Sequence, residues 1–164
     1  MTTGTKRLLP RSSAETLGGE PCDDVEEPGG AAEEYPSPPE RIPEWASVES
    51  REWRRLDEFD ILAKAEALTG LTLEIKNALL PSGVWGIHLV RGERGRIIVN
   101  AALSPFWRRF AVFHELYHLL HNTKGARFWQ STFFSMESFE NRADTFAWAA
   151  VWPEWEENQY CDWN

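Results

Sequence analysis

The pattern of apolar and polar positions divides the chain into a polar first third and a patterned remainder. From about residue 47, apolar side chains recur at intervals of three and four, which predicts an amphipathic helix that ends near Gly70. The apolar positions of this predicted helix are Trp53, Leu56, Phe59, Leu62, Ala65 and Leu68. Before it, residues 1–44 contain seven of the ten prolines and few apolar side chains. We therefore expect residues 1–46 to be a disordered, acidic, Pro/Gly-rich tail and residues 47–164 to form one domain.

Three short runs rich in β-branched and apolar residues follow, at 71–75, 84–90 and 96–100. Turn-forming segments separate them, Pro-Ser-Gly at 81–83 and Arg-Gly-Glu-Arg-Gly at 91–95. Since consecutive strands joined by short turns usually pair as neighbours, we expect a small antiparallel sheet.

Two further helices are predicted after the strands. Ser104 is a favourable N-cap and Pro105 a favourable first residue for a helix that reaches about His121. Ser135 or Ser138 caps a second helix, which we expect to end near Val151, before Pro153. The order helix, sheet, helix, helix is typical of an α+β fold. Four tryptophans near the end are expected to pack as a core cluster, with an exposed partner-binding patch as the alternative: Trp148, Trp152, Trp155 and Trp163.

The predicted helix over 105–121 contains the segment His-Glu-Leu-Tyr-His at 114–118. His114 and His118 lie one turn apart on one helix face, so both imidazoles can reach a single zinc ion. Glu115 leans over the same opening from the side, which is the position that a general base for a water molecule needs. Such a segment arises by chance only rarely, and its position inside an amphipathic helix favours a true metal site.

A catalytic zinc ion requires a third protein ligand. His121 is excluded because seven residues of helix rise about 10 Å, which separates it too far from His114. We interpret His121 as a residue that stabilises the helix C-terminus. His88 lies in a predicted strand without any ligand pattern, so we assign it a structural or surface role.

The next helix offers better candidates for the third ligand. Glu137, Glu140 and Asp144 share one face, next to an apolar face that can pack against the histidine-bearing helix. Glu140 is the predicted third ligand, and Asp144 is predicted to accept the free N–H of a ligand histidine and so fix its tautomer. Alternatively, these acids form a solvated face, a reading that fits Glu137 best.

The combined pattern resembles the gluzincin arrangement and, more narrowly, the ImmA/IrrE family of bacterial and phage metallopeptidases. The resemblance covers roughly residues 50–155 and includes IIVN at 97–100, RRFAVFHELYHLL at 108–120, ENRADTFA at 140–147 and Pro153. It implies a zincin-like domain, in which a helix bearing HExxH precedes a helix bearing the glutamate ligand. Tyr117 stands where the family often has glycine, and we expect it to pack beside the metal or to narrow the cleft.

The resemblance implies a zinc endopeptidase that cleaves a regulatory protein, such as a helix-turn-helix repressor of a phage or mobile element. The alternative is a non-catalytic zinc protein that binds a repressor or antitoxin, with the acidic tail mimicking nucleic acid or occupying the cleft. A structural zinc site is a third reading, but such sites are usually closed by four ligands and richer in cysteine.

Charge and hydropathy narrow the expected partners and location. The formal net charge is −9, and residues 1–49 hold 4 basic and 11 acidic side chains, so no basic stripe points to direct nucleic-acid binding. No apolar run is long enough for a signal peptide or a membrane span, so we expect a cytoplasmic protein without membrane contact. Nothing in the pattern indicates an oligomeric state.

Overall fold

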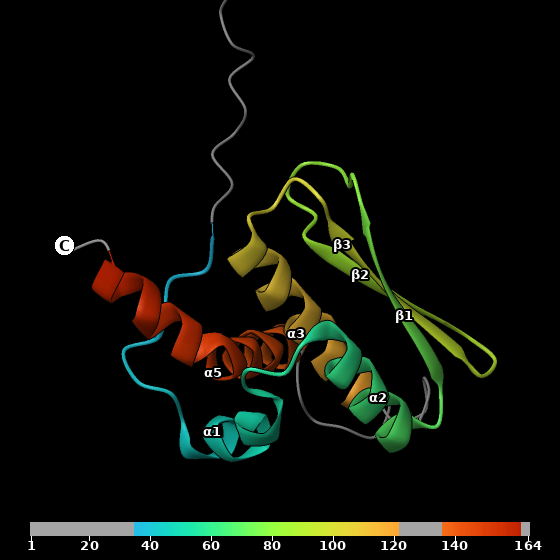
Figure 1. Ribbon diagram of the computed structural model, residues 1–164, viewed down its shortest axis with the longest axis horizontal. Coiled ribbons are helices and arrows are strands. Elements are labelled where there is room, and N and C mark those ends of the chain that lie inside the picture. Colours follow the sequence, from blue (N-terminus) through green and yellow to red (C-terminus); the bar gives the residue numbers. More distant parts are fainter. Residues whose placement is uncertain (1–34, 122–135, 162–164) are drawn as a thin grey trace, which may run out of the picture. The chain divides into compact units, whose positions relative to one another are not determined.

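The computed structural model describes residues 35–121 and 136–161, with side chains throughout except at 136–138 and 159–161. The elements are α1 (Glu44–Ser50), a 3-10 turn (Arg51–Trp53), α2 (Glu58–Thr69), β1 (Thr72–Ala78), β2 (Gly86–Arg91), β3 (Arg94–Asn100), α3 (Pro105–His121) and α5 (Met136–Cys161). This is the predicted α+β class (Figure 1). Helix α1 begins slightly before the boundary expected at residues 46–47. The predicted disorder of the tail concerns mainly residues 1–34, which lie outside the described ranges, and it stays a prediction.

The sheet is mixed, so the antiparallel prediction was wrong for one of its two pairings. Strand β3 lies in the centre, parallel to β1 and antiparallel to β2. The prediction assumed that neighbours in sequence pair in space, which holds for the hairpin β2–β3 but not for β1 and β2. Strand β3 contains the most buried positions of the three, including Ile97 and Val99, and a central strand is where such a run is best covered.

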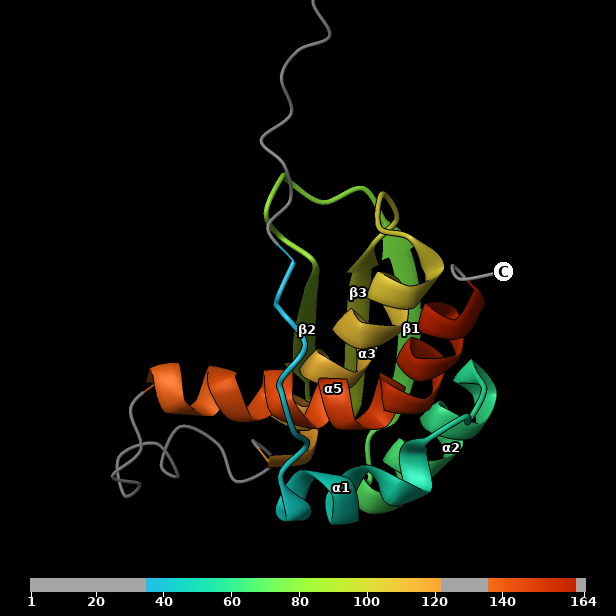
Figure 2. The same cartoon turned by 90° about the vertical axis from the view of Figure 1, so that its left-hand side faces the viewer.

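Helix α3 lies between the sheet and α5, and forms the middle layer of the fold (Figures 1 and 2). It contacts β2 and β3 on one side and α5 on the other, while α1 packs on α5 and α2 packs on β1. Phe110, Phe113 and Leu116 are fully buried in this layer. Helix α3 is therefore covered on two sides, and the polar side chains that it presents start from a well-packed position.

The predicted helix from residue 47 to Gly70 is interrupted. Between α1 and α2 the chain extends, and Arg55 adopts a positive φ of 60°. Asp57 then caps α2 by accepting a hydrogen bond from the backbone N–H of Asp60, and Gly70 ends the helix in the left-handed conformation as predicted. The interruption rotates the buried face of α2 onto Ile61 and Ala65, and it leaves Phe59 and Leu68 exposed.

Helix α5 continues through Pro153, where the sequence predicted its end. A proline has no N–H, so the carbonyl of Ala149, one turn earlier, loses its helical partner. Arg54, from the interruption before α2, supplies a replacement: its Nε donates to the Ala149 carbonyl at 3.1 Å. The same guanidinium also donates to the hydroxyls of Ser47 and Ser50 in α1. Arg54 therefore joins two helices, α1 and α5, at the point where α5 lacks one of its backbone hydrogen bonds.

The tryptophan-rich end of the chain packs mainly into the core. Trp148 is 2 % exposed and contacts aromatic rings of α3, and Trp152 and Trp155 pack against the core in part. Trp163 lies outside the described residues. At the other end, Tyr35 stacks on Trp107 with ring centroids 4.4 Å apart. Across the described ranges, every helix is too short or too polar to span a membrane.

Candidate metal centre

Helix α3 presents the two histidines as the HExxH spacing predicts. His114 and His118 are one turn apart, and their Nε2 atoms lie 3.0 Å from each other. His118 is 7 % exposed, and the side chain of His114 is partly buried. Both rings therefore point to one place at the surface of α3 rather than into solvent.

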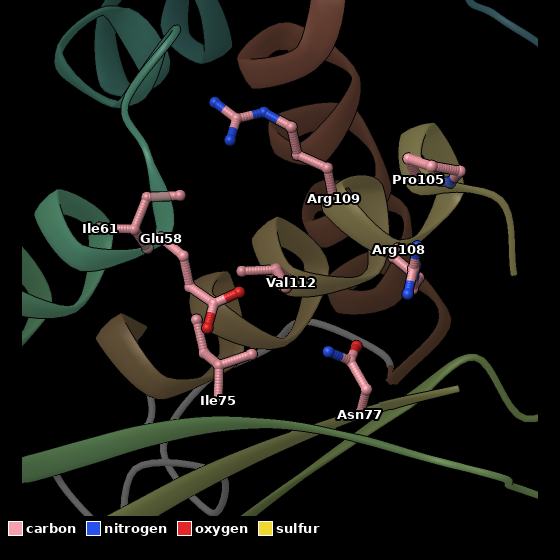
Figure 3. A pocket seen from close by; sticks show the side chains of 8 residues that line it. All are labelled: Glu58, Ile61, Ile75, Asn77, Pro105, Arg108, Arg109 and Val112. Atoms are coloured by element: carbon pink, nitrogen blue, oxygen red, sulfur yellow. The ribbon is translucent and has the colours of Figure 1, made fainter. Parts of the chain in front are cut away.

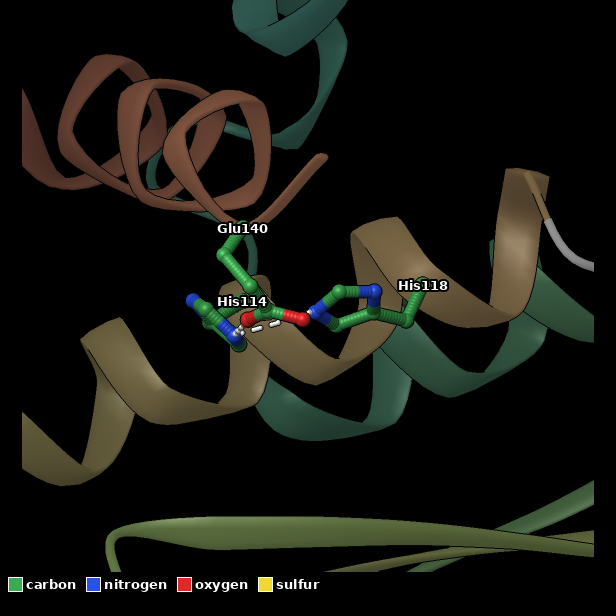
Figure 4. A group of neighbouring side chains, drawn as sticks. All are labelled: His114, His118 and Glu140. Carbon is green, nitrogen blue, oxygen red and sulfur yellow. Dashed lines mark hydrogen bonds and ion pairs between the residues drawn. The ribbon is translucent and has the colours of Figure 1, made fainter. Parts of the chain in front are cut away.

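Helix α5 brings Glu140 to the same place (Figure 4). Its Oε2 lies 3.2 Å from His114 Nε2 and 3.4 Å from His118 Nε2. Ala143 and Ala147 are fully buried on the neighbouring face of α5, and their small side chains allow α5 to approach α3 closely. The packing of two alanines thus sets the distance at which the carboxylate meets the imidazoles.

The three donor atoms fit a single metal ion. Two imidazole nitrogens and one carboxylate oxygen are a donor set that zinc accepts, and the candidate ligand atoms lie within 4.8 Å of one another. Ligand atoms at about 2.0–2.1 Å from a tetrahedral ion are separated by about 3.3 Å. The observed separations of 3.0–3.4 Å agree with that value. Three protein ligands would also leave one position open.

Asp144 stands behind His114, as predicted for a carboxylate that supports a ligand. Its Oδ1 lies 2.8 Å from His114 Nδ1. Because a carboxylate only accepts, Nδ1 carries the hydrogen and donates it, which leaves the Nε2 lone pair directed toward Glu140 and His118. This hydrogen bond selects the tautomer that metal binding requires.

The charges around the two histidines shift their pKa values in opposite directions. Burial lowers the pKa of His114, but the hydrogen bond to Asp144 and the nearby carboxylates outweigh burial and raise it above its ordinary value. Burial and then repulsion from His114 lower the pKa of His118, and the carboxylates offset this only in part. His114 therefore has the higher pKa of the two histidines and binds a proton more tightly.

Glu115 forms part of the wall of a cavity of about 320 Å³ beside the histidines. The cavity is also lined by Trp85, Gly86, His114 and Glu140. A Cβ at Gly86 would lie 3.0 Å from Glu115 Cγ, so a larger residue would fit here only if the Glu115 side chain shifted by a few tenths of an ångström. The Glu115 carboxylate therefore lies beside the candidate metal ligands and against β2, at a position where that strand has no side chain.

His88 lies closer to the candidate site than the sequence reasoning expected. It was assigned a structural or surface role, yet its Nδ1 lies 2.6 Å from Glu115 Oε2 and its ring stacks on that of His118. The available signal was the alternation of β2: Gly86 and His88 share a face, and that face turns toward α3. Reading this signal required knowing that β2 lies beside the HExxH helix, which depends on long-range pairing.

Other residues that the sequence analysis considered lie away from the cavity. His121 ends α3 with its Nδ1 2.9 Å from the carbonyl of Tyr117, and it lies outside the group of His114, His118 and Glu140. Tyr117 does not line the cavity: it is 1 % exposed, and its hydroxyl accepts a hydrogen bond from Arg142. The side chain of Glu137 lies outside the described part of the chain, as does that of Ser138, and Ser135 lies outside it entirely.

A second pocket, of about 310 Å³, lies on another face of α3, between α2 and β1 (Figure 3). Its polar side chains are those of Glu58, Asn77, Arg108 and Arg109. Arg109 forms an ion pair with Glu154 of α5 at 3.2 Å. The lining contains one carboxylate and no histidine or cysteine, so this pocket does not resemble a metal centre.

The fold and the site together define an α+β protein with a candidate metal centre of two histidines and one glutamate, built on an HExxH helix. Comparison with known families agrees with this class: the model of the M78 peptidase family, described as the IrrE N-terminal-like domain, matches residues 73–159. The match runs from β1 into the last turns of α5 and spans just over half of the chain, so the chain belongs to this peptidase family, as its sequence pattern indicated. Comparison of this chain with curated proteins and with solved structures gave no match.

Proposed function

We propose that this protein is a zinc-dependent endopeptidase in which Glu115 is the general base. The observation that carries the proposal is the convergence of His114, His118 and Glu140 on one point, with a second carboxylate at the cavity wall beside them. Zinc, when bound by such a group, lowers the pKa of a coordinated water and polarises a carbonyl oxygen.

The residues of the chain divide the work between them. His114, His118 and Glu140 hold the ion, and Asp144 keeps His114 in the required tautomer. Glu115 accepts a proton from water as the water oxygen bonds to the carbonyl carbon of the scissile peptide. The same carboxyl then passes that proton to the amide nitrogen as the C–N bond breaks, which yields an amine and a carboxylic acid that then releases its proton.

We propose a regulatory protein as the substrate, specifically a helix-turn-helix repressor of a phage or mobile element, met in the cytoplasm. Support comes from membership in the IrrE-like peptidase family. The net charge of −9 also favours a protein over a nucleic acid as the direct partner. Substrate identity does not follow from a fold, so it needs its own experiment.

The decisive variant is Glu115→Gln. Zinc-loaded wild type is incubated with a proteome-derived peptide library, and new peptide termini are identified by mass spectrometry. We expect cleavage by the wild type and none by Glu115→Gln, since the glutamine amide cannot accept the proton from water. Both proteins should retain one equivalent of zinc. Equal cleavage by the variant would refute the general-base role.

The substrate class is tested with a purified repressor encoded beside the gene. Cleavage of its intact chain by wild type, and not by Glu115→Gln, supports the proposed substrate. A stable stoichiometric complex without products, together with no cleavage of the library, would instead identify a zinc-containing interaction protein.

A further inference from the structure

Strand β2 carries a polar residue on the face that it turns toward α3. His88 alternates with Ile87 and Leu89, which are exposed on the opposite face of the strand. Its backbone is paired with Ile97 of the central strand, which is 1 % exposed. The side chain of His88 is thus projected from a well-anchored position in the sheet toward the metal centre.

The hydrogen bond between His88 and Glu115 has a defined direction. A glutamate carboxylate only accepts, so His88 Nδ1 carries the hydrogen and donates it to Oε2 over 2.6 Å. Within the described part of the chain, this is the one hydrogen bond formed by the Glu115 side chain, which is 11 % exposed. The orientation of the carboxylate therefore depends on a single donor.

The other carboxylate oxygen, Oε1, lies beside Gly86, where the strand borders the cavity. His88 itself does not line that cavity. We propose that His88 is a positioning residue: it holds Oε2 of Glu115 and so directs Oε1 into the cavity, where the proton is transferred. This inference rests on the proposed role of Glu115 as the general base.

A purely structural role for His88 is the competing explanation. Its ring stacks on that of His118, with centroids 5.6 Å apart and planes at 17°, so the ring could serve only to pack against a ligand. The two explanations differ in which part of the side chain matters. Positioning requires a donor at the place of Nδ1, whereas packing requires the flat ring.

The first experiment observes the hydrogen bond directly and requires no activity. Long-range ¹H–¹⁵N NMR spectra of the zinc-loaded protein report the tautomer of each of the four histidines, and His88→Asn identifies the signals of His88 by their loss. We expect the Nδ1–H tautomer in the wild type and its loss in Glu115→Ala. An Nε2–H tautomer of His88 in the wild type would overturn the proposal. So would His88 signals that are the same in the wild type and in Glu115→Ala.

The second experiment separates the donor from the ring. His88→Asn keeps an N–H at the place of Nδ1 without the ring, and His88→Phe keeps a ring without the donor. We expect His88→Phe to lower kcat roughly 10- to 100-fold at unchanged KM and zinc content, and His88→Asn to retain most of the activity. The reverse order would establish packing as the role. If zinc-loaded wild type cleaves nothing, the proposed function fails, and the NMR result alone decides whether His88 positions Glu115.

Discussion

Asp144 offers the sharpest test of the proposed metal centre, because it hydrogen-bonds to the candidate ligand His114 without being a candidate ligand itself. Its carboxylate accepts a hydrogen bond from His114 Nδ1 at 2.8 Å. Asp144→Asn keeps an acceptor oxygen but removes the charge, and Asp144→Ala removes both. Substituting such a supporting carboxylate typically lowers metal affinity by about 10- to 100-fold.

The structure places the two variants at different points in that range. Asp144 is 39 % exposed, so water can replace part of its interaction once the carboxylate is gone. We expect Asp144→Asn to weaken zinc binding by about 10-fold, equivalent to about 1.4 kcal/mol, and Asp144→Ala to approach about 100-fold. The larger effect reflects the loss of tautomer control over His114 in addition to the loss of charge.

Zinc affinity is measured by competition with a chromogenic chelator at a pH above the raised pKa of His114. Glu156→Gln is the matched control: it neutralises a carboxylate on the same helix that hydrogen-bonds to Trp152, away from the metal group. Its affinity should equal that of the wild type. Undiminished zinc affinity in Asp144→Ala would show that the hydrogen bond to His114 contributes nothing, and our account of the site would be wrong.

Three further predictions follow from the same contacts. Zinc binds neutral imidazole, so the apparent zinc affinity is highest above the raised pKa of His114 and falls as the pH drops through that pKa. In the same competition assay, the difference in zinc affinity between wild type and Asp144→Asn should become smaller at low pH. The reason is that the variant also binds the competing proton less tightly. Gly86→Ala should lower kcat/KM roughly 10- to 100-fold while leaving the circular dichroism spectrum unchanged, since the new Cβ displaces Glu115; an active variant would contradict the close approach. Arg54→Ala should lower the free energy of urea unfolding by about 1–3 kcal/mol, because it leaves the buried Ala149 carbonyl without a donor. The control Arg94→Ala, at an exposed position, should lower it by less than about 0.5 kcal/mol. Equal stabilities of the two variants would show that the carbonyl needs no replacement donor.

Features that depend on a few adjacent residues were predictable. The start of α3 at Pro105, the end of α2 at Gly70 and the pairing of His114 with His118 across one helical turn all follow from local geometry. Glu140 and Asp144 were predictable to a lesser degree. Their spacing places both on one helix face, but the resemblance to a family was needed to favour that face over a solvated one.

Features that depend on distant partners were not predictable in the same way. The position of β3 between β1 and β2 is settled by which strand is best buried, a property of the assembled sheet. The helix passes through Pro153, and the carbonyl that the proline leaves free is satisfied by Arg54, which is far away in sequence. The contact of His88 with Glu115 was not predictable for the same reason, since the two side chains meet only after β2 lies along α3.

The division of the candidate ligands between two helices links the proposed metal centre to the fold. Helix α3 supplies two nitrogens and α5 supplies one oxygen, so neither helix alone forms the site. Their separation is set by packing around Ala143 and Ala147, and the course of α5 beyond them depends on Arg54. A metal ion that binds only the assembled pair stabilises the folded state by mass action. By the same linkage, a substitution that loosens α5 weakens metal binding even when it leaves every ligand in place.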